Sequence, residues 1–321
     1  MIPLAEIVFV GHTSIDRVRN SNGEKIQPGG AALYAAYGAR TLCRDVCLVT
    51  AVGSDYSFWD ALSEFPAEFI ARRKGKSTRF DISYDANWNA HYRSFEPGPA
   101  SAITTRALLN AVRRGAAFVH VAPMNPPKVE RMVSALRGSG LDVKISVNSC
   151  INYMGSSANR KSILKAASMA DIFILNEREL HELTGVEVVP EAIKAIKSKT
   201  LVLTLGEIGT MIRSDGTRDL IPALAAITKK AVDVTGAGDT WSGSFLAAFH
   251  KTGSWIKAVS YASFVSAVKC TGWNFEKVSR LRFDSVEDVY DLVIAMKEKG
   301  RQLRLAEALK DRQQSGGPAR L

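Results

Sequence analysis

The stretch DVTGAGDTWSGSFLAAF, residues 233–249, decides how the rest of this 321-residue chain is interpreted. It opens as a glycine-rich turn and continues with apolar residues at helical spacing, so we expect a helix that begins near Gly236. The amides of Gly236, Ala237 and Gly238 can converge at the positive end of that helix and bind an anion. Asp239 in the first turn can accept a proton from an attacking hydroxyl. From spacing alone, a tight turn followed by a favourable first-turn charge explains the pattern equally well.

Two other phosphate-binding motifs are only partly present in the sequence. The turn is not a dinucleotide-binding fingerprint, because the third glycine of G-x-G-x-x-G falls on Trp241. The segment Gly75-Lys76-Ser77 ends like a Walker A loop, but its first glycine would fall on Ile70. These departures argue against hydride transfer and against a P-loop nucleotidase.

Upstream of the turn, apolar runs alternate with helix-like segments. The runs are residues 7–10, 46–53, 116–123, 142–148, 170–176 and 200–206. Continuous hydrophobic strands separated by helices are typical of a parallel sheet that is covered on both faces. The sequence therefore predicts an α/β fold with a layered α/β/α core and a mainly parallel sheet. In such a sheet, ligands bind at the carboxyl ends of the strands.

Two segments interrupt this rhythm. Residues 16–28 contain an Asn22-Gly23 turn between polar arms, and residues 77–96 alternate apolar and polar side chains. Alternation suits strands with one face in water, so we expect both segments to form a small separate β-sheet. The prediction is a single domain over residues 1–321, with inserted lid strands at about 16–28 and 77–96 and a C-terminal helix and tail over 300–321.

The chain is basic, with 42 Lys and Arg against 32 Asp and Glu, a net charge of +10. Much of the excess is peripheral, because residues 297–321 contribute +4 (seven basic residues less three acidic ones). The sequence has no zinc-finger spacing, RNA-binding aromatic motif or long basic run, which argues against a nucleic-acid partner. It also has no apolar run long enough to span a membrane and no signal-peptide pattern at its start, so we expect a cytoplasmic protein without membrane attachment. Four cysteines are too few for a disulfide framework.

Residues 233–249 resemble the C-terminal signature of the ribokinase-like carbohydrate kinases, the PfkB family. Other matches follow in the family's order: Gly11 and Asp16 after the first strand, the pair Gly29-Gly30, the N-x-x-E motif from Asn176 to Glu179, and Thr204, Gly206 and Gly209 in TLGEIGT. The matches span residues 7–250, and the GAGD turn with N-x-x-E at the family's distance is specific.

The resemblance implies a phosphotransferase with an alcohol group as acceptor, with ATP as phosphoryl donor and Mg2+ as cofactor. Asp239 would be the catalytic base, with Gly236, Ala237 and Gly238 forming the anion hole over the γ-phosphate. Asn176 would belong to the nucleotide site and Glu179 would hold Mg2+ through water. A helix N-cap with a first-turn glutamate also fits their spacing. The remaining nucleotide-binding residues implied are Thr204, Gly206, Gly209 and Thr235.

On the acceptor side, the resemblance assigns substrate hydroxyls to Asp16 and a lid hinge to Gly29 and Gly30, although a simple helix-entry turn explains the glycine pair as well. Asn148, directly after a strand, is a further candidate for the pocket. The lid residues Trp88, His91 and Arg93 are weaker candidates, since solvated strand residues would look the same.

Tyr34 stands where sugar kinases of the family usually carry an asparagine, so the chain is more similar to the inositol-kinase and nucleoside-kinase-like branch. The resemblance implies a small polyol or sugar as acceptor, with a nucleoside as the alternative. A catalytically inactive nucleotide-binding regulatory protein is the rival from another class. A requirement for a monovalent cation, the donor preference and a homodimer through the lid stay open.

Overall fold

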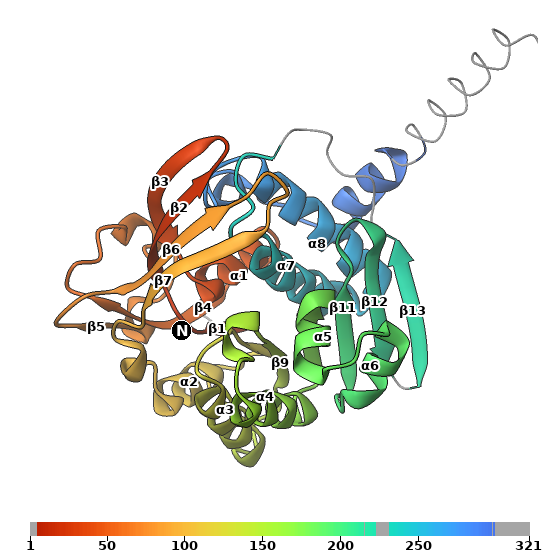
Figure 1. The fold of residues 1–321 in the computed structure, drawn as a ribbon, viewed down its shortest axis with the longest axis horizontal. Coiled ribbons are helices and arrows are strands. Elements are labelled where there is room, and N and C mark those ends of the chain that lie inside the picture. The colour runs from red at the N-terminus through yellow and green to blue at the C-terminus, as the bar shows by residue number, and fades with distance from the viewer. Residues whose placement is uncertain (1–4, 215, 223–230, 297, 299–321) are drawn as a thin grey trace, which may run out of the picture.

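The computed structural model describes residues 5–214, 216–222, 231–296 and 298. The helix and tail expected over residues 300–321 lie outside this part of the chain. The described residues form a large sheet sandwiched between helices and a smaller sheet that projects from one end (Figure 1).

The large sheet has nine strands in the order β13-β12-β11-β10-β9-β8-β1-β4-β5. Along the chain they are β1 (Ile7–Val10), β4 (Val46–Gly53), β5 (Ile70–Arg73), β8 (Phe118–Val121), β9 (Lys144–Asn148), β10 (Ile172–Asn176), β11 (Thr200–Thr204), β12 (Gly209–Ser214) and β13 (Thr217–Pro222). Neighbours from β11 to β5 pair in parallel, whereas β12 and β13 add two antiparallel strands at one edge. Every residue of β1, β4 and β8 is buried, as the continuous apolar runs predict.

Helices cover both faces of this sheet (Figure 1). One face packs against α1 (Ala31–Arg40), α7 (Ala237–Thr252), α8 (Trp255–Cys270) and the helical residues 286–296. The other face packs against α2 (Thr105–Val112), α3 (Pro126–Gly138), α4 (Ser157–Met169), α5 (Glu177–Thr184) and α6 (Val189–Ala195). The layered α/β/α core with a mainly parallel sheet is thereby confirmed.

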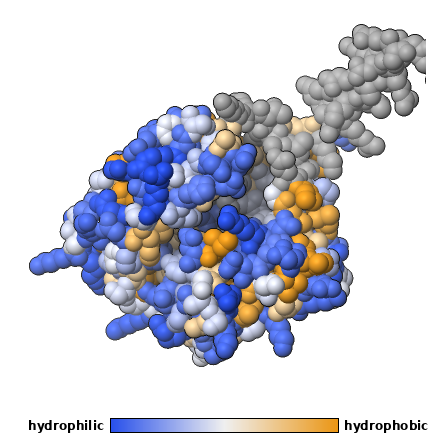
Figure 2. Space-filling model, in the orientation of Figure 1, coloured by the Kyte–Doolittle hydropathy of each residue, from blue (hydrophilic) through white to orange (hydrophobic). Residues whose placement is uncertain are grey.

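The small sheet has the order β3-β2-β6-β7 and is formed by β2 (Ser14–Asn20), β3 (Gly23–Gly29), β6 (Thr78–Tyr84) and β7 (Ala90–Glu96). It consists of two antiparallel hairpins joined by the parallel pair β2–β6. The expected lid segments thus form one sheet. Figure 2 shows the molecule hollowed below these strands, where the lid overhangs the body.

The tip of the β2–β3 hairpin is fastened to the body. The side-chain amides of Asn20 and Asn22 each donate to the carbonyl of Val232 at 3.1 Å. Val232 is bound in turn to the end of α8, because its amide donates to the carbonyl of Cys270 at 2.7 Å. One hairpin of the lid is therefore held against the segment that leads into α7.

Among the described residues, none of the helices has the length and apolar character required to cross a membrane.

Candidate active site

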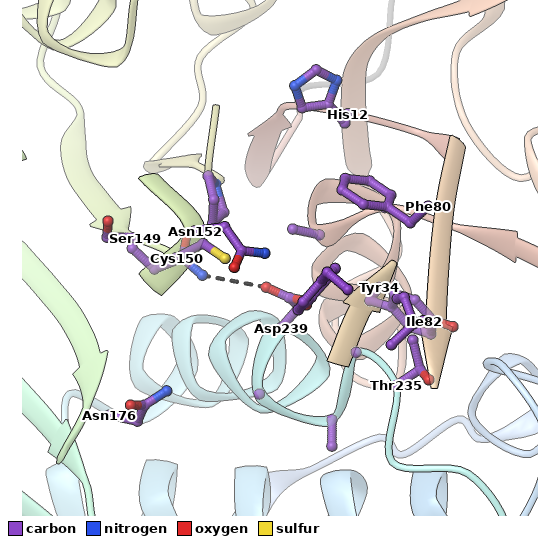
Figure 3. A pocket seen from close by; sticks show the side chains of 18 of the residues that line it. His12, Tyr34, Phe80, Ile82, Ser149, Cys150, Asn152, Asn176, Thr235 and Asp239 are labelled. Atoms are coloured by element: carbon purple, nitrogen blue, oxygen red, sulfur yellow. Dashed lines mark hydrogen bonds between the residues drawn. The ribbon is translucent and has the colours of Figure 1, made fainter. Parts of the chain in front are cut away.

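A cavity of about 530 Å3 lies between the carboxyl ends of the central strands, the start of α7 and the underside of the lid (Figure 3). Residues from seven separate segments of the chain, between His12 and Ser242, line it. Of the residues singled out from the sequence, it brings together Asp16, Gly30, Asn148, Asn176, Glu179, Thr204, Thr235, Gly236, Ala237, Gly238 and Asp239. Residues up to 223 positions apart in the chain therefore share one site, as a ligand site at the carboxyl edge of an α/β sheet requires.

The glycine-rich turn begins α7 as expected. Gly236 is the N-cap residue, with a φ of 71° in the left-handed region that favours glycine. The amide of Ala237 donates to the carbonyl of Val234 at 3.1 Å and so closes the turn itself. The amides of Gly236 and Gly238 make no such bond within the described chain. We infer that these two, with the positive end of the helix dipole, are the donors best placed for an anion.

Tyr34 fixes the position of this turn. A methyl group on Gly236 would come within 2.3 Å of the Tyr34 ring, so the backbone of the turn rests directly on the aromatic face. The ring is almost fully buried, and its hydroxyl accepts a hydrogen bond from Nε2 of Gln27 at 3.3 Å. The position that departs from the sugar-kinase pattern thus supports the glycine-rich turn from beneath.

Asp239 projects from the first turn of α7 into the cavity, where Nδ2 of Asn148 donates to its Oδ1 at 3.4 Å (Figure 3). Loss of water around the carboxyl raises the pKa of Asp239 to about 6, and the Asn148 bond opposes that shift. A carboxylate with a pKa just below neutrality is ionised at pH 7 and still basic enough to take up a proton, as a general base must be.

Asp16 is the second carboxylate of the site and is only 2% exposed. Burial raises its pKa to about 7, and the hydroxyl of Ser14, which donates to Oδ1 at 2.6 Å, works against that rise. Gly29 does not line the cavity, because it packs behind Asp16. Gly30 does line it, with a φ of 103°, and a methyl group there would come within 2.3 Å of the His12 carbonyl oxygen. The glycine pair is therefore required for close packing at the start of α1, whatever its part in lid movement.

Asn176 and Glu179 form a capping box at the start of α5. Oδ1 of Asn176 accepts from the Glu179 amide at 2.8 Å, and Oε2 of Glu179 accepts from the Asn176 amide at 3.0 Å. Both residues also line the cavity, so the helix-cap and nucleotide-site interpretations apply to the same pair.

The donor set at Glu179 suits a magnesium ion held through water. Loss of hydration raises the pKa of its carboxyl to about 8, with a further rise from Asp239, and a nearby dication would favour the ionised form. The described residues contain no cluster of three or more metal-binding side chains. Magnesium commonly keeps several waters and binds one or two carboxylates together with substrate phosphates, which fits this arrangement.

Only some of the residues expected around the nucleotide line the cavity. Thr204 at the end of β11 and Thr235 before the turn line the cavity. Gly206 and Gly209 follow β11 but lie outside the cavity lining, with positive φ values of 55° and 134°. They shape the connection into β12, and they stay predictions as nucleotide contacts.

Sequence reasoning did not pick out the aromatic underside of the lid. Phe80, Tyr84, Tyr92 and Phe95 line the cavity, and the rings of Phe80 and Phe95 stack with centroids 4.9 Å apart. In β6 the sequence does indicate this face, because the apolar residues 80, 82 and 84 alternate with polar ones. In β7 the alternation is broken by a register shift opposite Asp81 and Ile82. The shift brings Tyr92 and Phe95, which are three residues apart, to one face.

Other lid candidates differ in their placement. Arg93 lines the cavity, whereas Trp88 and His91 do not. Trp88 lies in the β6–β7 turn with a φ of 62°, and Nε2 of His91 lies 3.7 Å from a carboxylate oxygen of Asp85.

His12 lines the far end of the cavity, where burial lowers its pKa to about 4, so it is neutral at pH 7.

Known proteins resemble the chain over most of its length. A protein named cytidine kinase from Thermococcus kodakarensis is 28% identical over 256 residues, which are 77% of this chain and 90% of that protein. A nucleoside kinase from Methanothermobacter thermautotrophicus is 27% identical over 271 residues, 79% of this chain and 80% of that protein.

Solved structures share the fold. The nucleoside kinase of Burkholderia thailandensis in complex with inosine superposes with a TM-score of 0.72 at 19% identity, covering 89% of this chain and 96% of that one. The nucleoside kinase of Methanocaldococcus jannaschii, described as an archaeal member of the ribokinase family, gives 0.67 at 18% identity over 92% and 98% of the two chains. The predicted ribokinase-like architecture is confirmed.

A family model described as pfkB family carbohydrate kinase matches residues 75–273, which include the N-x-x-E motif, the glycine-rich turn and Asp239. Together with the shared fold and the gathering of the signature residues around one cavity, this match shows that the chain belongs to the pfkB family of carbohydrate kinases.

Proposed function

We propose that the chain is a nucleoside kinase, which transfers the γ-phosphoryl group of ATP to a ribose hydroxyl. The observation that carries the proposal is the aromatic face of the lid, whose rings line the same cavity as Asp16 and Asp239. A planar base can stack on such rings, a contact worth about 1–3 kcal/mol per base in proteins that bind single-stranded nucleic acid. A free polyol or sugar offers no comparable apolar surface.

The named relatives support the same acceptor. The two relatives described above, which match more than three quarters of this chain, carry nucleoside-kinase names, and one of the solved structures holds inosine. They favour the nucleoside alternative over the polyol or sugar acceptor that the sequence analysis placed first.

In the proposed reaction, Asp16 accepts hydrogen bonds from ribose hydroxyls and holds the acceptor against the turn. Asp239 takes the proton of the attacking hydroxyl as the oxygen–phosphorus bond forms. The amides of Gly236 and Gly238 stabilise the negative charge that develops on the transferring group, and the bond to the ADP leaving group breaks. Thr204 and Thr235 line the part of the cavity that would receive the phosphates of ATP.

The metal part of the site would be held at α5. Glu179, oriented by its bond to the Asn176 amide, would hold the waters of a bound Mg2+ ion. When bound, magnesium neutralises charge on the triphosphate and so assists departure of ADP.

A phosphate-coupled assay tests the acceptor. Cytidine, adenosine, inosine, ribose, fructose and myo-inositol are compared at equal ATP and Mg2+. We expect the best nucleoside to exceed ribose and inositol in kcat/KM by roughly 100-fold, the value of about 3 kcal/mol of base stacking. Ribose or inositol used as well as every nucleoside would contradict the proposal.

A matched pair of variants tests the aromatic face. Tyr92→Leu removes a ring from the cavity wall, whereas Trp59→Leu removes a ring of similar exposure outside it. The first should raise KM for nucleosides and leave any activity on ribose unchanged, and the second should change neither.

The rival function is an inactive nucleotide-binding regulatory protein. Calorimetry that shows ATP binding, without phosphoryl transfer to any acceptor, would favour it. The presence of Asp239, Asn176 and Glu179 argues against this role.

A further inference from the structure

A buried ion pair lies directly behind the phosphate turn and has no part in the reaction described above. Lys269, in the last turn of α8, and Asp233, three residues before Gly236, are both fully buried. Nζ of Lys269 lies 2.7 Å from the Asp233 carbonyl oxygen and 3.2 Å from Oδ2. Removing two charges from water is costly, and well-packed apolar side chains often serve stability as well or better. Stability alone therefore does not explain the pair.

Asp233 is a junction between three parts of the chain. Its Oδ1 accepts from the amide of Thr235 at 2.8 Å, and its Oδ2 accepts from the amide of Asn274 at 3.0 Å. Nε2 of Gln27, on lid strand β3, donates to the same Oδ2 at 3.2 Å. Because Thr235 is the residue before Gly236, the orientation of the Asp233 carboxylate sets the path by which the chain enters the turn.

Besides its bonds to Asp233, Lys269 lies over the ring of Tyr34, the side chain that supports the turn. Its Nζ lies 5.6 Å from the centre of the Tyr34 ring, the ring on which Gly236 rests. Burial lowers the pKa of Lys269, and the charge of Asp233 opposes that fall. The ammonium thus lies between Asp233 and Tyr34, the two contacts that determine where the amides of the turn point.

We propose that Lys269 is a positioning residue for phosphoryl transfer: it holds the Asp233 carbonyl and carboxylate so that the turn from Gly236 to Gly238 keeps the geometry of an anion site. The inference rests on the proposed kinase function, because the anion in question is the transferring phosphoryl group.

The test compares Lys269→Met with Lys257→Met. Methionine keeps the length of the side chain and removes the charge, and Lys257 lies on the same helix in a partly exposed pair with Glu287 at 2.7 Å. We expect Lys269→Met to lower kcat per folded enzyme by about 100-fold, the size of effect that an ångström-scale misplacement produces, with the acceptor KM little changed. Amide hydrogen exchange in residues 233–240 should become faster. Lys257→Met should match the wild type in all three measurements.

A second variant guards against misfolding. Lys269→Met leaves the Asp233 carboxylate buried without its counter-charge, which is strongly destabilising, whereas Asp233→Asn with Lys269→Met removes both charges. If the single variant does not fold, the double variant should fold and show the same loss of kcat and the same faster exchange.

The inference would be overturned if a folded Lys269 variant kept the wild-type rate of amide hydrogen exchange in residues 233–240, or the wild-type kcat. A wild-type protein that phosphorylates none of the acceptors would reject the proposed function alone, because the exchange measurement still decides whether Lys269 positions the turn.

Discussion

Gly29 lies against the carboxylate of Asp16, so closely that a methyl group on Gly29 would stand 1.8 Å from Oδ2. Asp16 is buried and bound to Ser14, so a side chain at residue 29 would force its carboxylate out of this position. The absence of a side chain at residue 29 is thus a condition for the position of a carboxylate in the proposed acceptor site.

Substituting Gly29→Ala should therefore act on the acceptor. We expect displacement of Asp16 to raise the acceptor KM roughly 10- to 100-fold, the value of a hydrogen bond to a charged group, while ATP affinity stays the same. Steady-state kinetics and calorimetry measure the two effects. Gly155→Ala is the matched control, because a methyl group there meets nothing within 4 Å. An unchanged acceptor KM would refute this role for Gly29.

Replacing the proposed base tests the chemical step. Asp239→Asn should lower kcat by about 100- to 10,000-fold, the usual contribution of a general base, with acceptor binding and the thermal midpoint close to those of the wild type. Asp60→Asn, at an exposed position, should have no effect. Near-normal turnover by a folded Asp239→Asn enzyme would exclude Asp239 as the base.

The pH dependence should reflect the raised pKa of Asp239. A base must be ionised to act, so kcat/KM should rise with pH through about 6 and level off above it. Asn148→Ala removes the hydrogen bond that opposes the rise in pKa, so the acid limb should move to higher pH. Asp16 titrates in the same range, near 7, and the variant identifies which limb belongs to Asp239. A limb that stays in place would assign it to another group.

Asp16 should also make stability depend on pH. Its pKa is about 7 in the folded chain and near 3.8 when unfolded, so the folded state holds a proton that the unfolded state loses between these values. Stability should therefore fall as pH rises from about 4 to 7. Asp16→Asn removes this dependence, and its gain over wild type should grow across that window to at most about 4 kcal/mol. Urea unfolding at pH 5 and pH 8 measures the difference, and an equal gain at both would contradict the assignment.

The Lys269 ammonium bears on the question of a monovalent cation. It already faces both the carbonyl and the carboxylate oxygens of Asp233, so the segment before the turn has a cation that belongs to the chain. We expect equal rates in NaCl, KCl and NH4Cl at one ionic strength. Activation by one cation over the others would show that a second cation site exists.

Patterns within single segments predicted much of this molecule. The apolar runs of β1, β4, β8, β9, β10 and β11 are buried in a parallel sheet, and the turn before Asp239 begins a helix. Each depends on residues close in sequence, where periodicity and turn chemistry act directly.

Contacts between distant residues were not predictable in this way. The support of Gly236 by Tyr34 and the pairing of Asp233 with Lys269 join positions 202 and 36 residues apart, and no local pattern encodes them. The antiparallel strands β12 and β13 were not predicted, because these edge strands are short and largely polar and lack the continuous apolar run of a buried strand. The aromatic lid face was missed because a bulge breaks its period of two.

The two hairpins of the lid have unequal attachments, which suggests how the acceptor range could be altered. The β2–β3 hairpin carries Asp16 and Gln27 and is hydrogen-bonded to Val232 and Asp233, which lead into the glycine-rich turn. The β6–β7 hairpin carries the aromatic wall and ends in a turn, residues 85–89, that is bound within itself. On the proposed function, an exchange of β7 and the 85–89 turn that keeps the parallel pairing of β6 with β2 should change the acceptor preference and leave Asp16 in place.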